Sequence, residues 1–578
     1  MSNLQPKNSF SWGDALFLYI ERPGQPLSIA GVSLFEGSIP LKACRDLVES
    51  KLPLIPRYRQ RVAFPPLNLG LPTWQFDPTF DIRNHIRQVT LRNGTEAQLK
   101  KLASGILSTH LDRQRPLWDI TLVRGLQGNR TGLIARIHHC LADGVAGVGI
   151  MNVLMDTSPV PQRVPRVKKQ APETHEHRDA GAALLDGLVK SSLSALQGAL
   201  TLHSEAVQIA QGILANSGES LTQLLNVLPE LAAPADRLPF NVVCHGPQKF
   251  GWTELDLPAI KAVKERCGGT VNDVILSVVA AALRRYAELR KVRVKGRSAR
   301  IVVPVNVRSG NSADELGNRI TFVPVTLPLD VRDPVKLLAA VRQRTEYIKH
   351  VHAAELVVFA GGLFAAIPAP IWAAIGPVAS QLPLSLCNLI CTNVPGPQMP
   401  LYLLGRKMVA WYPYVPIGGE MGTNWAVLSY NGKVYFGFSC DLGAVPDPET
   451  LEKFVEQSFA ELCASAKRVQ PQEKLEPATA SAGQRSETTE PRRRERSRMI
   501  PLSEPETQKA QPRTKAKSKA RTKSKANGAA ETGSTQPPTV KAAPANETIP
   551  PKPAAVETTT GVATPESAHE RVAQAIGA

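Results

Sequence analysis

The fold is decided by residues 131–155, which read TGLIARIHHCLADGVAGVGIMNVLM. Thr131–Ile137 is a short apolar run and predicts a strand, which ends at the adjacent histidines His138 and His139. Val145–Met155 is apolar and long enough to predict the helix that follows. Reactive groups of α/β folds commonly lie at such strand-to-helix junctions. The stretch therefore predicts an α/β protein with its chemistry near the two histidines.

The two histidines are expected to play unequal parts. Neighbouring side chains on a strand point to opposite faces, so only one imidazole can readily enter a given pocket. A neutral imidazole is suited to removing a proton from an alcohol. Asp143 could orient a ring or fix the loop through an arginine, and Gly144 allows a tight turn into the helix. The alternative is that both histidines are structural residues at a strand end.

Strands and helices also alternate on either side of this stretch. The first 160 residues contain predicted strands at 29–35, 118–124 and 132–139, and predicted helices at 41–52 and 97–111. A Pro- and charge-rich connector at 159–176 and a mostly helical region at 179–231 follow. The second half repeats the alternation, with predicted strands at 253–257, 299–305, 320–327, 408–412, 425–430 and 433–441, and helices at 273–291 and 334–350.

These patterns divide the chain into four parts. We expect an N-terminal α/β half at 1–160, a linker and helical connector at 161–235, and a C-terminal α/β half at 236–470. Residues 471–578 contain no Phe, Trp or Tyr and cannot bury enough apolar surface to order themselves. We therefore expect a disordered tail.

The segment 356–405 contains no charged residue and no histidine. Its first part, 356–376, is long enough to cross a bilayer, but prolines at 368, 370, 377 and 383 interrupt the segment. Three interpretations stay open: a transmembrane helix, a buried core or acyl-pocket wall, and a membrane-surface contact.

The formal net charge of the chain is +18, and the tail carries only a third of this surplus. A basic surface suits nucleic acid, acidic lipid headgroups or the phosphates of coenzyme A, and charge alone does not choose among them. The basic clusters at 492–498 and 513–525 are either a solvated tail, an anionic-membrane tether or a nonspecific nucleic-acid contact.

Several other classes of protein lose support. The eight cysteines include no C-x-x-C pair, which fits a reducing cytoplasm and argues against a structural zinc site or a disulfide framework. The N-terminus has no long apolar stretch behind a basic start, so a secretory signal is not expected. No G-x-S-x-G, H-E-x-x-H or phosphate-loop motif occurs, which disfavours serine hydrolases, zinc proteases and P-loop enzymes.

His138, His139, Asp143 and Gly144 match the HHxxxDG signature of the CoA-dependent acyltransferase superfamily. Further motifs resemble those of the bacterial wax ester synthase/diacylglycerol acyltransferases within it. In order along the chain they are Pro116-Leu117-Trp118 (PLW), Asn272-Asp273 (ND), Leu316-Gly317-Asn318-Arg319 and Thr392-Asn393-Val394-Pro395-Gly396-Pro397. The resemblance spans roughly residues 10–465 and leaves out the tail.

This resemblance implies two halves like chloramphenicol acetyltransferase, with the site at their interface. It implies that His139 is the general base and that acyl-CoA is a co-substrate, with no cofactor, no metal and no covalent acyl-enzyme. Asp143 is implied to be structural, and Asn272 to lie near the site, where its amide orients the acceptor or stabilises an oxyanion. Asn272-Asp273 could equally be a helix cap. Asn393 is implied to shape a turn beside the cleft. Residues 116–118 line the acyl path or simply begin a buried strand.

The implied reaction moves a long-chain acyl group to diacylglycerol, giving triacylglycerol, or to a long-chain alcohol, giving a wax ester. We expect a cytoplasmic protein associated peripherally with the inner membrane or lipid droplets, and no nucleic-acid partner. One alternative is a condensation-type acyltransferase that takes its acyl group from a carrier protein. Another is a noncatalytic protein that binds lipid droplets or membranes.

Overall fold

The computed structural model describes residues 10–65, 68, 70–142, 144–160, 233–306, 320–350, 371 and 386–469. Several expectations lie outside these residues: the helical connector, the disordered tail, the apolar segment 356–376 apart from Ile371, and the motif at 316–319. Asp143 lies outside them as well.

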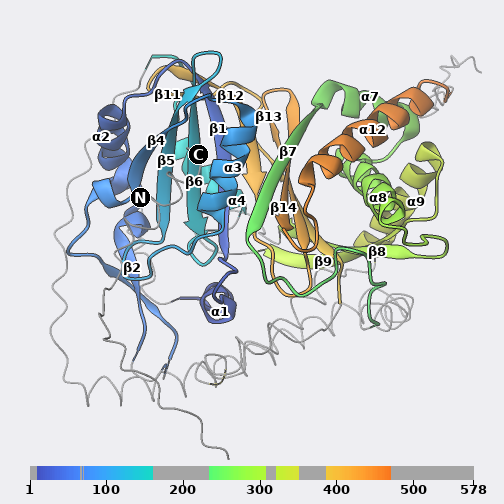
Figure 1. Cartoon of the computed structure of the whole chain (residues 1–578), viewed down its shortest axis with the longest axis horizontal. Helices are drawn as coiled ribbons and strands as arrows, with labels where there is room; N and C mark the ends of the chain where they lie inside the picture. The colour runs from blue at the N-terminus through green and yellow to red at the C-terminus, as the bar shows by residue number, and fades with distance from the viewer. Residues whose placement is uncertain are drawn as a thin grey trace, which may run out of the picture. The chain divides into compact units, whose positions relative to one another are not determined.

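The first of two six-stranded sheets carries the histidines (Figure 1). Its strand order is β11–β12–β1–β6–β5–β4. These strands are β1 (Ser28–Glu36), β4 (Ile86–Thr90), β5 (Trp118–Leu126), β6 (Arg130–His138), β11 (Tyr402–Leu403) and β12 (Arg406–Tyr414). The helices of this half are α1 (Trp12–Ile20), α2 (Leu41–Lys51), α3 (Glu96–Leu107) and α4 (Gly144–Leu154). A separate hairpin consists of β2 (Gln60–Ala63) and β3 (Thr73–Phe76), and single 3₁₀ turns are η1 (Leu52–Leu54), η2 (Pro56–Arg59) and η4 (Ile82–Asn84).

The second sheet has the order β7–β14–β13–β10–β8–β9. Its strands are β7 (Gln248–Asp256), β8 (Ser298–Asn306), β9 (Ile320–Pro328), β10 (Leu389–Pro395), β13 (Thr423–Tyr430) and β14 (Lys433–Asp441). Its helices in the described part of the chain are α7 (Leu257–Cys267), α8 (Val271–Leu289), α9 (Pro334–His350) and α12 (Pro448–Ala466). The mixed α/β fold expected from the sequence is confirmed, and most predicted elements lie within one to five residues of their observed bounds.

Strand β12 comes from the second half of the sequence but belongs to the first sheet. It pairs antiparallel with β1, from Ala30 opposite Tyr414 to Phe35 opposite Met408. Buried apolar residues form two clusters. The first includes Met408 and Trp411 of β12, together with Trp252 and Tyr435 of the second sheet. The division at residues 160 and 236 stays a prediction, but sheet membership does not follow it.

The central position of β6 fixes the histidines. β6 lies between β1 and β5, with Ser28 opposite His138 and Trp118 opposite Ile137. An apolar strand buried by partners on both sides is held in register, because a shift by one residue would turn every side chain to the other face.

Helix α8 spans 19 residues of the second half, and most of its residues are buried. Among the described residues, no single helix is both long and apolar enough to cross a membrane. Only α7 and α8 taken together pass that test by length and composition, and a bend of 99° separates them.

Candidate active site

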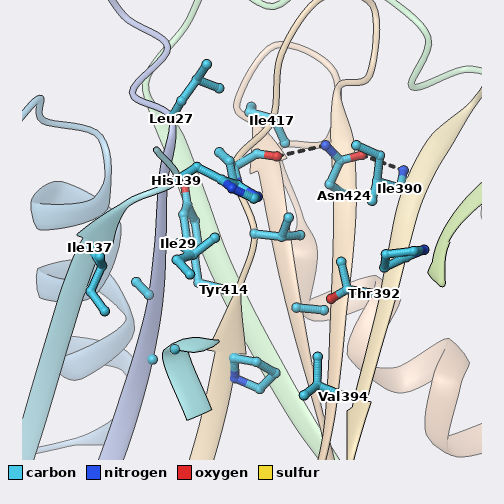
Figure 2. Close-up of a pocket in the computed structure, with 18 of the residues that line it drawn as sticks. Leu27, Ile29, Ile137, His139, Ile390, Thr392, Val394, Tyr414, Ile417 and Asn424 are labelled. Carbon is cyan, nitrogen blue, oxygen red and sulfur yellow. Dashed lines mark hydrogen bonds between the residues drawn. The ribbon is translucent and has the colours of Figure 1, made fainter. Parts of the chain in front are cut away.

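A cavity of about 390 Å³ lies between strands of the two sheets (Figure 2). Helices α1 and α4 and strands β1, β6 and β12 form one side of it, and strands β10 and β13 form the other. Most of the lining side chains are apolar, such as Ile29, Ile137 and Val394. A concave, mainly apolar site with few polar groups is the usual form of a small-molecule pocket.

His139 reaches into this cavity from the end of β6, and Figure 2 shows its ring directed toward the opposite wall. Its backbone N–H donates to the carbonyl of Leu27 at 2.9 Å. Its imidazole stacks on the ring of Phe17, with centroids 4.0 Å apart and planes within 8°. Among the described residues that line the cavity, His139 is the only histidine. His138 does not line the cavity, and its side chain is buried.

Burial lowers the pKa of His139 from its ordinary value to about 4, and the nearby His138 lowers it further, although a backbone hydrogen bond acts in the opposite direction. Desolvation disfavours the charged imidazolium. The ring is consequently neutral at physiological pH and holds a nitrogen lone pair that can accept a proton.

His138 is 1 % exposed and faces a carboxylate. Its Nδ1 accepts the backbone N–H of Cys140 at 3.2 Å, which assigns the ring proton to Nε2. Nε2 lies 3.3 Å from Oε1 of Glu21. The backbone N–H of His138 donates to the carbonyl of Leu117 at 3.0 Å. His138 is thus fixed on three sides and has no path to the cavity.

Glu21 is a buried carboxylate with contacts to four residues. Oε1 accepts the N–H of Leu27 at 2.9 Å and lies 3.4 Å from His110, and Oε2 accepts from Arg113 at 2.8 Å. Burial by itself would raise the pKa of Glu21, but the contacts with His110 and His138 hold that pKa well below its usual range. Glu21 is therefore ionised, and it joins the end of α1 to the histidine strand. No sequence motif singled it out; the available signal was a lone acid at the end of the apolar helix WGDALFLYI.

Two polar side chains face His139 from the opposite wall. Asn424 donates to the carbonyl of Pro416 at 2.8 Å and accepts the N–H of Ile390 at 2.8 Å, so both ends of its amide hold the wall together (Figure 2). The hydroxyl of Thr392 points toward the cavity. Thr392 is the first residue of the motif at 392–397, and its hydroxyl can donate a hydrogen bond inside the cavity.

Asn272 and Asn393 meet each other and do not line the cavity. The amide of Asn393 donates to Oδ1 of Asn272 at 3.1 Å. Strand alternation explains the position of Asn393, because Thr392 and Val394 on either side of it take the cavity face of β10. The pair links the start of α8 to β10, which is a different position from the predicted contact with substrate.

Asp273 is buried in a capping box at the start of α8. Its Oδ2 accepts the N–H of Thr270 at 2.8 Å, and the Thr270 hydroxyl accepts the N–H of Asp273 at 3.2 Å. Its Oδ1 accepts the Thr345 hydroxyl at 2.7 Å. The helix-cap interpretation of the ND motif fits this geometry, with Thr270 as the N-cap residue and Asp273 three positions later.

Pro116, Leu117 and Trp118 also lie away from the cavity. Trp118 begins β5, donates from Nε1 to the carbonyl of Tyr58 at 2.8 Å and stacks on His85. Together with the Leu117 carbonyl, it supports the strand that carries the histidines. This arrangement matches the interpretation of a buried strand start, and none of the three lines the cavity.

Gly144 begins α4, and the next turns of this helix, through Gly147, Val148 and Met151, form part of the cavity wall. Within the described residues there is no group of three or more His, Cys, Asp or Glu side chains that could hold a metal ion.

Comparison with known proteins shows the family of the chain. A model of the wax ester synthase/diacylglycerol acyltransferase catalytic domain matches residues 10–275, and a model of the C-terminal domain of the same family matches residues 316–463. A putative diacylglycerol O-acyltransferase of Mycobacterium tuberculosis H37Rv is 30 % identical over 474 residues, which cover 77 % of this chain and 89 % of that protein. The chain belongs to the wax ester synthase/diacylglycerol acyltransferase family. A probable diacylglycerol O-acyltransferase of the same strain is 28 % identical over 464 residues, or 79 % of this chain and 96 % of that protein.

Two solved structures have the same fold as this chain. The wax ester synthase/diacylglycerol acyltransferase of Marinobacter aquaeolei VT8 matches with a TM-score of 0.56 at 23 % identity, over 79 % of this chain and 100 % of that chain. The first condensation domain of the calcium-dependent antibiotic synthetase matches with a TM-score of 0.51 at 13 % identity, over 82 % of this chain and 100 % of that chain.

Proposed function

We propose that the protein is an acyl-CoA-dependent O-acyltransferase that transfers a long-chain acyl group to diacylglycerol or to a long-chain alcohol. The observation that carries this proposal is a neutral His139 imidazole at the wall of an apolar cavity between the two sheets. Membership of the family supports it, as do the names of the mycobacterial relatives, which are diacylglycerol O-acyltransferases.

In the proposed reaction, His139 accepts the proton of the acceptor hydroxyl while its oxygen attacks the thioester carbonyl carbon. A new C–O bond forms, the C–S bond breaks, and the leaving thiolate of coenzyme A takes the proton back from the imidazolium. No covalent acyl-enzyme, metal or cofactor takes part. The Thr392 hydroxyl, on the wall opposite His139, is a candidate to stabilise the developing oxyanion.

The buried network gives this base its orientation. Leu27 holds the backbone of His139, Glu21 holds the backbone of Leu27, and Phe17 covers one face of the imidazole. An imidazole fixed in this way loses little entropy when the reaction begins. Asp143 keeps the structural role implied by the family, and Gly144 permits the turn into α4.

The apolar walls suit an acyl chain and an alcohol of low polarity. Such an acceptor is insoluble, so we propose that the protein works peripherally on the cytoplasmic face of the inner membrane or on lipid droplets. Acyl-CoA and diacylglycerol or a long-chain alcohol are the proposed partners, and nucleic acid is not.

Purified full-length protein should be given labelled palmitoyl-CoA with diacylglycerol and with hexadecanol in parallel. We expect labelled ester and free coenzyme A in equal amounts. His139→Ala should reduce this turnover by about 10³-fold or more, because the base is removed. His245→Ala, which removes an exposed histidine away from the cavity, is the matched control and should leave the rate unchanged.

The structural match to a condensation domain makes a carrier-protein donor the second candidate. Transfer from an acylated carrier protein but not from palmitoyl-CoA would favour that candidate. Lipid binding without turnover, equal in the wild type and His139→Ala, would instead indicate a noncatalytic lipid-binding protein. Activity that survives in His139→Ala would show that another residue is the base.

A further inference from the structure

The β2–β3 hairpin exposes large apolar side chains in an unusual concentration. Phe64 and Phe76 are 41 % and 43 % exposed, and Leu54, just before the hairpin, is 42 % exposed. Figure 1 shows the hairpin projecting past the end of the first sheet, on the side where α1 lies. The sequence that joins the two strands, residues 64–72, reads FPPLNLGLP and contains no charged residue. Clustered apolar side chains on a surface mark a site of interaction.

Basic side chains lie on the same hairpin as these phenylalanines and just before it. Residues 52–76 include Arg57, Arg59 and Arg61 and no Asp or Glu. Arg59 is exposed and Arg61 is partly exposed, whereas Arg57 lies over the Trp74 ring. Along β2 the arginines precede Phe64, which follows the last paired residue, Ala63, whereas Phe76 lies opposite Gln60 at the base of the hairpin, next to the arginines. Exposed phenylalanines close to arginines fit an anionic lipid surface, which offers acyl chains to the rings and charged headgroups to the guanidinium groups.

Helix α1 connects this hairpin to the cavity. The backbone N–H of Phe10, just before α1, donates to the carbonyl of Pro72 at 3.1 Å, and its ring stacks on Trp74 with centroids 4.1 Å apart. The other end of the helix forms part of the cavity wall through Phe17 and Ile20.

One face of α1 continues the apolar surface. Trp12, Leu16 and Ile20 are spaced four residues apart, so they share that face. Each is partly exposed; Trp12 and Leu16 also pack against the first buried cluster, and Ile20 lines the cavity. The only charged residue of the helix is Asp14, which receives a hydrogen bond from Ser11 and leaves the surface with a positive balance. We call Trp12, Leu16 and Ile20 together with Arg59, Arg61, Phe64 and Phe76 the α1–hairpin surface.

We propose that the α1–hairpin surface docks on an anionic lipid surface and delivers the lipid acceptor from it to the cavity of His139. The proposal rests on the proposed function, because it places the entry of an insoluble acceptor beside the helix that borders the reacting group. Arginines provide the long-range attraction, and aromatic side chains enter the interface once the surfaces touch.

Two variants of the full chain test the surface: the double variant Arg59→Gln/Arg61→Gln, and Phe64→Ser. Their matched controls are Arg293→Gln/Lys295→Gln, which removes two exposed charges in the second half, and Met399→Ser, which removes an exposed apolar side chain elsewhere. Every variant keeps the basic tail, so differences between variants report on the surface and not on the tail. Thermal unfolding should be the same for all.

The first measurement is flotation with vesicles of phosphatidylcholine and phosphatidylglycerol. We expect about tenfold weaker binding for each surface variant, with unchanged binding for the controls. Vesicles of phosphatidylcholine alone should bind the wild type weakly. Binding of the surface variants equal to that of the wild type, or an equal loss in the controls, would overturn the proposal.

The second measurement compares two acceptors with palmitoyl-CoA as donor. Diacylglycerol in the anionic vesicles should be acylated about tenfold more slowly by the surface variants, while hexanol dissolved in water should be acylated at the wild-type rate. An equal loss with both acceptors would overturn docking, since it would indicate a damaged site. If the wild type acylates neither acceptor, the proposed function fails, and flotation alone still decides where the protein meets the lipid.

Discussion

Oε1 of Glu21 lies 3.3 Å from Nε2 of His138 and also accepts the N–H of Leu27, whose carbonyl in turn accepts the N–H of His139. One carboxylate oxygen therefore contacts the first histidine and, through Leu27, the second. This network links the first histidine of the pair to the second, and the first histidine does not line the cavity.

Glu21→Gln should slow acyl transfer and destabilise the protein by about 1–3 kcal/mol. If the amide oxygen of Gln keeps the hydrogen bond from the N–H of Leu27, the amide NH₂ faces the guanidinium of Arg113. Two hydrogen-bond donors then face each other at the position where Oε2 of the native carboxylate accepts from Arg113. Urea unfolding and the initial rate with palmitoyl-CoA measure the two effects. A variant that keeps the wild-type rate would show that His139 does not depend on this network for its position.

The rate should resist acidification further than an ordinary histidine would allow. His139 acts as a base only when neutral, and burial places its pKa at about 4, so kcat/KM should stay level below pH 6.5 and fall as the pH approaches 4. A pH–rate profile of the purified protein checks this, with far-UV circular dichroism at each pH as the control for folding. An acid limb centred near pH 6.5 would contradict the assignment.

The lowered pKa of His139 also makes the free energy of unfolding depend on pH. An unfolded histidine takes up its proton near pH 6.5, whereas folded His139 does so near pH 4, so the unfolded state binds more protons between these values. The free energy of unfolding should thus decrease as the pH falls from 6.5 to 4. In His139→Gln this decrease should be smaller, which denaturant titrations at the two pH values would reveal; an equal decrease would assign the effect to other groups.

Phe17→Ala should move the acid limb of the pH–rate profile upward. The Phe17 ring covers one face of His139, and its removal admits water that stabilises the imidazolium. Phe17→Leu, which keeps the site apolar, is the control and should shift the limb less. Equal profiles for Phe17→Ala and the wild type would mean that the opposite wall supplies the desolvation.

Gly437→Ala should destabilise the protein by about 3 kcal/mol or more. A Cβ on Gly437 of β14 would lie 1.8 Å from the carbonyl oxygen of Pro413 in β12, and a backbone atom cannot move aside cheaply. Gly149→Ala, on the exposed side of α4 with no neighbour within 4 Å, should stabilise by about 0.5–1 kcal/mol. Thermal or urea unfolding of the pair measures both, and a neutral Gly437→Ala would disprove this close approach of the strands.

The sequence predicts local elements well because their patterns are local. The strand before His138 and the helix after Gly144 follow from an apolar run and a change of period, and the structure has both. The unequal directions of the two imidazoles follow from strand alternation alone.

Contacts between distant segments were beyond the sequence patterns. The pairing of β12 with β1 joins residues almost four hundred positions apart. No pattern in residues 408–412 predicts which strand they pair with. The part that Glu21 plays beside the site could not be predicted for the same reason, because its partners His110, Arg113 and His138 come from other segments. The motif places Asn393 beside the predicted site, but the residues of β10 that line the cavity are its neighbours Thr392 and Val394.

The crossing of β12 has a practical consequence for anyone who divides this protein. A gene fragment that ends in the connector would leave the edge of β1 unpaired, and unpaired strand edges invite aggregation. The fragment that contains the rest of the chain would include β12 without its partner strand β1. Chimaeras with a relative should thus take residues 402–414 from the same parent as residues 10–160, whichever parent supplies the rest.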